Sequence, residues 1–438
     1  MSLRQQIDRL KGAKTGLESS IEGKGVTVPD EALIDTYSVY VDAIEQGGGE
    51  SYDFTEIGYS QAVSDGINND TKNEIVDGIA YAKQIAETWN PNTTDARNYF
   101  GYDKRLIYLP NINTAKVNSL CDSSSNGMFQ YATKLQYIDN LSFPNIINKS
   151  VSTLFTNCAS LKKINSLSFG SVTTTANMFN NCYNLKEAPL FNTTNCTRMD
   201  YMFVNCSSLE SVPSYDMGNV TQANYMFDGC ISLENVPMLN TVKCTNMQNM
   251  FRNCKRLTSV PQLDFSAVAS TAYMFYGCGS LEEVGNMSFP NIQSTGNVTY
   301  MFASCSSLKR VGNLDFHYTP NINSLFNGST NLESIGTITA PLITSTVNSF
   351  FSTANKLTDF GGIQNLKMNW NDSSGLVKCP NLTHQSLINV LNGLYDFTGA
   401  GQTPSSTQGK LKLGTANYNK LSAEDIAIGT NKGWAITI

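Results

Sequence analysis

Cysteine is the residue of this sequence whose spacing could most readily support chemistry. It returns at fixed intervals, as in "MFVNCSSLESVP" at 202–213 and in the next two units. Such a column could supply metal ligands, disulfide partners or nucleophiles. Three residues after a recurring Phe, the column reads Ala132, Cys158, Cys182, Cys206, Cys230, Cys254, Cys278, Cys305, Ser329 and Ala354. Because Cys exchanges with Ala and Ser within one chain, we predict small buried structural thiols.

Other residues that could carry out chemistry are few. The only histidines, His317 and His384, lie far apart in the sequence, and no phosphate loop, metal-spaced Cys pair or serine elbow occurs. Asp216 and Asp264 would lie roughly 10 Å apart on a stacked coil, close to the separation used by inverting glycosidases. Nothing in the sequence raises the pKa of either carboxyl or forms a cleft. We therefore predict no enzyme, cofactor or metal, and keep polysaccharide hydrolysis only as an alternative to test.

The elements that carry these residues repeat about every 24 residues. The Phe recurs at Phe129, Phe155, Phe179, Phe203, Phe227, Phe251, Phe275, Phe302, Phe326 and Phe351. Leu follows each Phe by six residues, and further apolar residues follow at nine, twelve, fourteen and seventeen. No single helix or strand period produces this set. A coil that turns once per unit does, because equivalent residues then stack on one another.

Two short patterns indicate the shape of each turn. Leu263-Asp264-Phe265 has the in-out-in spacing of a short strand, and stacked turns would pair such strands in parallel. Asn or Gly stands two residues after most of the Phe residues, which predicts a left-handed backbone there. The predicted fold class is an α+β repeat protein, a solenoid with a parallel β-ladder of about ten 24-residue turns.

Four regions follow from these patterns. We predict a helical attachment or oligomerisation segment at 1–46, a linker and helical N-terminal cap at 47–124, the solenoid at 125–370, and a small α/β C-terminal cap at 371–438. In the C-terminal cap, "LTHQSLINVLNGLYDF" predicts a helix and "GKLKLG" a strand. "SAEDIAIGTNKGWAITI" predicts a helix, a Gly turn and a final strand. The caps would cover the ends of the coil.

The N-terminal segment carries two apolar stripes. The candidate attachment residues are Leu3, Ile7, Leu10, Leu17, Ile34, Tyr37 and Val41. These stripes exceed what one small hairpin can bury alone. We therefore expect the segment to pack against partner chains, including copies of itself. The alternative is an amphipathic helix that packs only on its neighbour.

An outward column stands thirteen residues after each Phe. Its candidate binding residues are Asn192, Asp216, Asn240, Asp264, Ser288 and Asp315. The column could be a solvated ladder face, or it could be a binding face for a glycan or a protein.

The repeat motif "MFxxCxSLxxVPxLxF" resembles the BspA-type, or Treponema pallidum-type, leucine-rich repeats of bacterial surface proteins, over about residues 125–370. That resemblance implies a parallel leucine-rich-repeat solenoid and a role in adhesion or protein contact. The C-terminal residues resemble the C-terminal module of the same proteins. The opening, chiefly "LKGAKTGLESSIEGKGVTVP", resembles attachment segments of bacteriophage tail and fibre proteins.

Together these resemblances suggest a bacteriophage virion structural protein, a tail or fibre component that presents a leucine-rich-repeat surface for host or subunit recognition. The alternative is a bacterial cell-surface adhesin of BspA type. Expected partners are other virion proteins, further copies of the chain, and a host surface glycan or protein. The net charge of −6 without basic blocks argues against nucleic acid. The lack of a signal peptide or long apolar stretch predicts a product made in the host cytoplasm and located in the virion, without membrane insertion.

Overall fold

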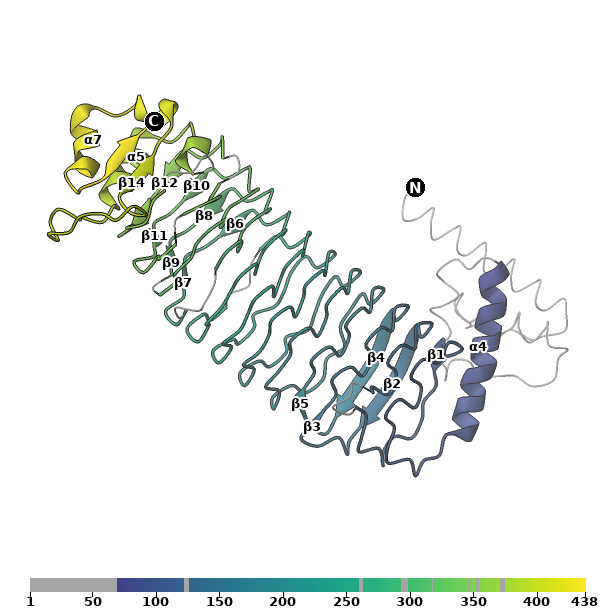
Figure 1. Ribbon diagram of the computed structural model, residues 1–438. Helices are drawn as coiled ribbons and strands as arrows, with labels where there is room; N and C mark the ends of the chain where they lie inside the picture. The colour runs from purple at the N-terminus through teal and green to yellow at the C-terminus, as the bar shows by residue number, and fades with distance from the viewer. Residues whose placement is uncertain are drawn as a thin grey trace.

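The protein is an elongated coil with a helix at one end and a small mixed module at the other (Figure 1). The computed structural model describes residues 69–438 apart from 122–125, 260–262, 293–297, 317, 346, 352–353 and 371–374. The predicted attachment residues Leu3, Ile7, Leu10, Leu17, Ile34, Tyr37 and Val41 lie outside the described residues. Among the described residues, no helix combines the length and the apolar character needed to cross a membrane.

A stack of Phe rings forms the centre of the coil. From Phe129 to Phe326, the ring centroids of successive turns lie 5.1–5.7 Å apart and the rings are nearly parallel. The Leu residue six positions after each of these Phe residues is fully buried. This arrangement confirms the coil that turns once per repeat. Phe100 also joins the stack, 5.4 Å from Phe129, although its longer sequence spacing conceals it from the period.

Parallel strands flank the Phe stack near both ends of the coil. One sheet contains β1 (Tyr108–Leu109), β2 (Tyr137–Phe143) and β4 (Lys163–Phe169), and β3 (Lys149–Ser150) pairs with β5 (Val172–Thr174). The later turns form two further ladders. One holds β6 (Glu283–Val284), β8 (Arg310–Val311), β10 (Ser334–Ile335) and β12 (Asp359–Phe360). The other holds β7 (Met287–Ser288), β9 (Leu314–Asp315), β11 (Ile338–Thr339) and β13 (Ile363–Gln364). Every pair is parallel, as predicted.

The middle turns differ from both ends. Between β5 and β6 the described residues form isolated bridges instead of regular strands (Figure 1). The expected strand at Leu263-Asp264-Phe265 is therefore wrong. Its side-chain alternation is nevertheless present, because Asp264 is exposed while Phe265 is buried.

Proline explains why the ladder is interrupted. Pro189, Pro213 and Pro237 stand ten residues after the repeat Phe in the middle turns. Glycine holds the same position in the later turns, where the N–H groups of Gly312 and Gly336 donate to the preceding turn at 2.8 and 2.9 Å. Because proline has no N–H, it cannot make this bond, and the ladder stops.

The predicted left-handed turn is confirmed. Asn157, Asn181 and Asn205 have φ angles of 58–63°, and Gly229 has 76°. The amides form a ladder, in which Asn181 Nδ2 donates to Asn157 Oδ1 at 2.8 Å and Asn205 Nδ2 donates to Asn181 Oδ1 at 2.9 Å. A Cβ atom at residue 229 would lie 2.6 Å from Asn205 Oδ1. A side chain at residue 229 would therefore require the Asn205 amide to shift.

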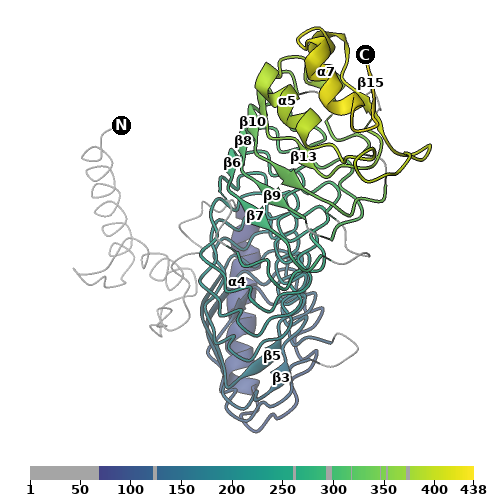
Figure 2. The ribbon, with the colours of Figure 1, turned by 90° about the vertical axis from the view of Figure 1, so that its left-hand side faces the viewer.

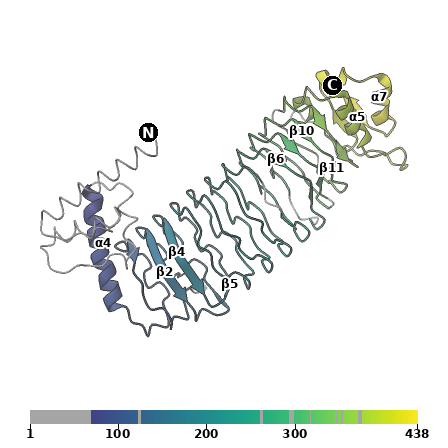
Figure 3. The ribbon, with the colours of Figure 1, turned by 180° about the vertical axis from the view of Figure 1, so that it is seen from behind.

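Helix α4 (Asn69–Thr88) lies beside the first strand, β1 (Figure 3). Ile85 and Trp89 are buried in the same apolar core as the Phe stack. The Trp89 indole N–H donates to the carbonyl of Asn113 at 2.7 Å. The helix thus covers the beginning of the apolar core.

The C-terminal module covers the other end of the coil (Figure 2). It comprises η3 (Leu376–Lys378), α5 (His384–Asn392), β14 (Lys410–Lys412), α6 (Thr415–Tyr418), α7 (Ala423–Thr430) and β15 (Ala435–Thr437). Helices α5 and α7 and strands β14 and β15 fall in the segments predicted for them. Helix α5 packs on β12 and β13. Ser386 Oγ accepts the Phe360 N–H at 2.9 Å and donates to the Thr358 carbonyl at 3.0 Å, so α5 satisfies the last strand edge.

Replacing Ser386 by Ala should destabilise this end of the coil. The buried Phe360 N–H would lose its acceptor, and leaving such a donor unpaired costs about 1–3 kcal/mol. Urea unfolding followed by circular dichroism measures the change. Gln385→Ala, at the exposed neighbouring position, should change the unfolding free energy by less than about 0.5 kcal/mol. Equal effects of the two substitutions would contradict the capping role of Ser386.

Candidate binding surface

The outward column predicted from the sequence does face solvent. Asn192, Asp216, Asn240, Asp264 and Ser288 are exposed, and Asp315 is half-exposed. Ser288 in β7 and Asp315 in β9 are directly paired across the ladder. The period therefore identified one continuous side of the coil.

Three members of this column also accept hydrogen bonds that close the loop in which they stand. The side-chain Oδ1 of Asn192, Asp216 and Asp264 accepts the N–H two residues later, at 3.0, 2.9 and 2.7 Å. These are Asx turns, which explain why Asn and Asp alternate there. The sequence period did not reveal this role, although Asn or Asp followed two residues later by Thr, Gly or Ser is its local signal.

The surroundings of Asp264 stabilise the ionised form of its carboxyl group. Hydrogen bonds from the hydroxyl and backbone N–H of Ser266 hold the pKa of Asp264 below its ordinary value. A glycosidase acid requires a raised carboxyl pKa. Asp264 is therefore suited to accepting hydrogen bonds or binding a cation, and unsuited to donating a proton.

A hollow of about 570 Å³ lies over the proline-containing turns. Its lining includes Ser214, Asp216, Met238, Asn240, Thr241 and Asp264. The structure thus brings together three of the six predicted residues, Asp216, Asn240 and Asp264. The others lie apart from this hollow, since Asn192, Ser288 and Asp315 do not line it. Sequence reasoning missed Met238, whose side chain is 71% exposed.

The main-chain bonds of the later ladder are missing at one side of the hollow. In the later ladder, Leu314 N–H and Phe316 N–H donate to the next turn at 2.9 and 2.7 Å. Residues 212–217 and 236–241, all of them described, exchange no such main-chain bond. The hydroxyl of Thr241 instead donates to the Asp264 carbonyl at 2.8 Å. The hollow therefore combines carboxylates, hydroxyls and an exposed apolar side chain.

The outer members of the column belong to the ladder itself. Ser288 Oγ donates to Asp315 Oδ2 at 3.3 Å, and the buried Asp315 Oδ1 has no hydrogen-bond partner. Their side chains engage each other across adjacent strands. They are consequently weaker candidates for ligand contact than the residues around the hollow.

The cysteine column has a structural role that its spacing did not reveal. All eleven cysteines are free thiols. From Cys158 to Cys305, each thiol of the column donates to the carbonyl of the Phe one turn earlier, at 3.1–3.2 Å. Ser329 makes the equivalent bond at 2.6 Å. The position therefore takes a small buried side chain, which is Ala at both ends of the column, and Cys or Ser there adds a hydrogen bond between turns.

The remaining residues that could carry out chemistry are the possible metal ligands and the two histidines. Among the described residues, no cluster of three His, Cys, Asp or Glu side chains could hold a metal ion. His384 Nε2 lies 2.9 Å from Asp425 Oδ2, which links α5 to α7. His317 lies outside the described residues.

A protein-family comparison agrees with the repeat architecture. The family model described as "Mycoplasma protein of unknown function, DUF285" matches residues 73–190, 149–259, 173–288 and 233–340. These overlapping matches cover more than half of the chain. The chain belongs to the DUF285 family. A search of curated proteins found no significant match.

Several solved leucine-rich-repeat structures resemble the DUF285 coil. One is from Bacteroides ovatus ATCC 8483, with 16% identity and a TM-score of 0.24, covering 71% of this chain and 85% of that one. An internalin (inlF) from Listeria monocytogenes has 14% identity and a TM-score of 0.26, covering 71% and 82%. A Leptospira interrogans protein has 12% identity and a TM-score of 0.20, covering 83% and 99%. Similarities at this level say nothing about function.

Proposed function

We propose that this DUF285 protein is a recognition component of a bacteriophage virion, in a tail or a fibre. Its solenoid would contact the host surface or neighbouring subunits through the hollow over the proline turns. The observation that carries the recognition role is the gathering of Asp216, Asn240 and Asp264 around that hollow. The protein acts by binding, without catalysis.

The chemistry of the hollow suggests what it binds. Met238 and Leu190 expose 71% and 65% of their surface, unusually much for large apolar residues. The carboxylates of Asp216 and Asp264 and the amide oxygen of Asn240 beside Met238 can accept hydrogen bonds. A host glycan or protein segment that combines an apolar group with hydrogen-bond donors fits this lining.

The location on a virion is supported by the opening sequence at 1–46. It resembles attachment segments of phage tail and fibre proteins, so we propose that it binds other virion proteins and further copies of the chain. A mildly acidic chain is unsuited to nucleic acid. We propose no membrane insertion.

Deleting residues 1–46 should leave a folded solenoid that no longer joins its assembly. Mass spectrometry of purified virions would detect the full chain and miss the truncated one, while circular dichroism of the truncated chain would remain that of a folded protein. Absence of the full chain from virions would refute the location. Normal incorporation of the truncated chain would place the anchor elsewhere, with the C-terminal module as the next candidate.

Binding through the hollow has a matched test. Asp216→Asn with Asp264→Asn removes two charges, while the Asn side chains keep the Asx turns, as Asn192 does. Labelled protein carrying both substitutions should bind host cells at least tenfold less tightly, with an unfolding free energy within about 0.5 kcal/mol of wild type. Ser288→Asn, outside the hollow, should bind normally. Undiminished binding of the double variant would exclude the hollow.

A second function, a bacterial surface adhesin, is favoured by the BspA-type motif. Fractionation of uninfected source cells distinguishes the two proposals, because an adhesin should appear at the surface of those cells. A virion component should appear there only during infection.

A further inference from the structure

Among the described residues, six tyrosines hold a left-handed backbone conformation, and four of them share the position two residues before the repeat Phe. Tyr201 and Tyr225 have φ of 59°, and Tyr273 and Tyr300 have φ of 57°. A left-handed backbone costs most L-residues about 1–2 kcal/mol, and Asn and Gly tolerate it best. Asn249 holds the same position in the turn between the two pairs. Retaining Tyr against this preference suggests a role for the ring.

The four rings form a strip along the coil. Tyr201 and Tyr225 stack with centroids 4.8 Å apart and planes 8° apart, and Tyr273 and Tyr300 stack at 4.8 Å and 6°. All four are half-buried. Each ring therefore presents an edge and a hydroxyl to solvent, at a spacing set by the turns. This strip of Tyr201, Tyr225, Tyr273 and Tyr300 stands two residues before the repeat Phe. The column that lines the hollow stands thirteen residues after it.

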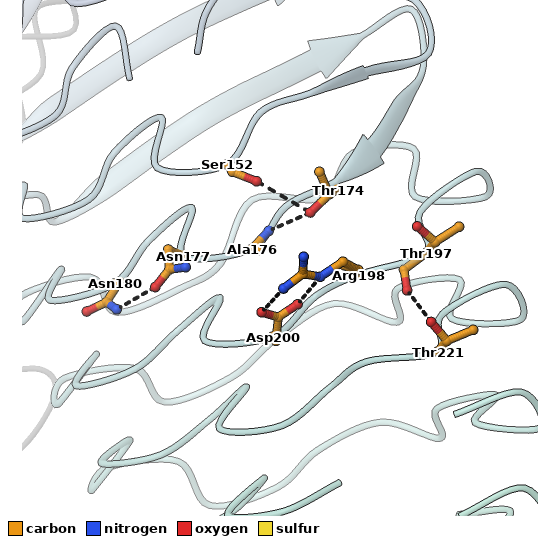
Figure 4. Close-up of polar contacts among 9 residues, drawn as sticks. All are labelled: Ser152, Thr174, Ala176, Asn177, Asn180, Thr197, Arg198, Asp200 and Thr221. Atoms are coloured by element: carbon orange, nitrogen blue, oxygen red, sulfur yellow. Dashed lines mark hydrogen bonds and ion pairs between the residues drawn. The ribbon is translucent and has the colours of Figure 1, made fainter. Parts of the chain in front are cut away.

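Polar side chains border the tyrosine strip. Gln222, Asn224 and Gln248 are half-exposed beside it. Figure 4 shows polar side chains of these and the preceding turns, where the Asn180 amide donates to Asn177 Oδ1 at 2.9 Å and the Thr221 hydroxyl donates to the Thr197 carbonyl at 3.2 Å. Amides and hydroxyls next to aromatic rings are suited to binding many hydroxyl groups at once.

The surface around the strip carries no net charge. The Arg198 guanidinium donates two bonds to Asp200, at 2.9 and 2.8 Å (Figure 4). Arg252 makes the same bidentate contact with Asp228 at 2.9 Å. The strip lies in the segment of each turn that begins five residues before the repeat Phe and ends one residue after it. Between residues 174 and 303, these segments contain only the four charged residues Arg198, Asp200, Asp228 and Arg252. An acidic polymer therefore finds no unpaired cation here.

We propose that the tyrosine strip binds a linear, neutral polysaccharide laid along the axis of the coil. Sugar rings lie against the exposed edges of the tyrosine rings, and sugar hydroxyls exchange hydrogen bonds with the tyrosine hydroxyls and the neighbouring amides. A polymer with a regular repeat suits a surface that repeats at every turn. The absence of net charge favours neutral sugars over nucleic acid or acidic glycans. This surface is separate from the hollow and goes beyond the function proposed for it.

Affinity electrophoresis tests the proposal with three soluble probes. A β-glucan and a mannan are neutral, and hyaluronate is acidic. At least one neutral polysaccharide should retard the full-length protein, and hyaluronate should not. Tyr225→Asn with Tyr273→Asn should weaken that retardation at least tenfold. Asn suits the left-handed backbone, so the double variant should remain folded, which its circular dichroism spectrum checks.

Two control variants make the outcome specific. Tyr183→Asn removes an exposed tyrosine outside the strip and should leave the retardation unchanged. Asp216→Asn with Asp264→Asn disables the hollow and should also leave it unchanged, so failure of one surface is distinguishable from failure of the other. The proposal is overturned if neither neutral polysaccharide retards the wild type, if only hyaluronate does, or if the folded double tyrosine variant binds as wild type.

Discussion

At pH 10.5 the solenoid is expected to have lost most of the stability that it has at pH 8. The reason is its buried thiols. Ten of the eleven cysteines are buried, and burial raises the pKa of each. For Cys196 and Cys305 the pKa rises from 9.0 to about 12.

The direction of the effect follows from the two states of the chain. In the unfolded chain these thiols lose their protons near pH 9.0, whereas in the folded chain they keep them. Because the folded pKa is the higher one, the stabilisation is fully present below pH 9. It is lost as the pH rises from there toward the folded pKa. Each thiol exposed by unfolding then costs about 1.4 kcal/mol per pH unit.

A serine variant isolates this contribution of the thiols. Cys206→Ser, Cys230→Ser and Cys254→Ser together keep the hydrogen-bond donors, as Ser329 does. Above pH 9 the unfolding free energy of the triple variant, from urea titrations, should fall less steeply than that of wild type, by about 4 kcal/mol per pH unit. Tyrosine and lysine titrations act on both proteins alike. Identical slopes would show that thiol ionisation does not drive the loss.

Replacing Leu233 by Ala is expected to cost about 2–5 kcal/mol. Leu233 is fully buried in the apolar core, and its truncation leaves a cavity that the stacked turns cannot close. Cys230→Ala, three residues earlier, should cost only about 1 kcal/mol. The Phe203 carbonyl would lose the Cys230 thiol but keep the N–H of Cys206, which donates at 3.1 Å.

Urea unfolding of the two variants at pH 7 measures both costs. Cys230→Ser retains a donor and should lie closer to wild type than Cys230→Ala. If Cys230→Ala proved more damaging than Leu233→Ala, the thiol would have a role beyond a small hydrogen-bond donor. Metal that copurified in stoichiometric amount would lead to the same conclusion.

Much of the fold could be predicted because the repeat places equivalent residues on top of one another. The Phe and Leu columns followed directly from spacing. The left-handed turn followed from Asn and Gly, whose backbone preferences are local. Helices α5 and α7 and strands β14 and β15 of the C-terminal module followed from apolar patterns and from turn residues such as Gly433, which has φ of 87°, whereas η3 and α6 were not predicted.

Features that depend on contacts between turns could not be predicted. The hydrogen bonds from the thiols to the Phe carbonyls depend on how neighbouring turns are aligned, which the repeat spacing alone does not give. Phe100 was not predicted to join the Phe stack because its sequence distance from Phe129 differs from the repeat length. The side of the coil that carries Asp216 and Asp264 was predicted, but the hollow between them lies where residues 212–217 and 236–241 lack the main-chain bonds of the later ladder, which the repeat spacing does not show. The tyrosine strip was missed because Tyr has no preference for the backbone that it adopts.

The proline turns also determine how the rod responds to force. Tension along the axis acts on the bonds between successive turns, and fewer main-chain bonds join residues 212–217 to residues 236–241 than join the later turns. This side of the middle turns is therefore less restrained than the same side of the later turns. When the rod is pulled from both ends, the coil would bend or open there first, which changes the shape of the hollow. A ligand in that hollow would in turn stiffen the rod.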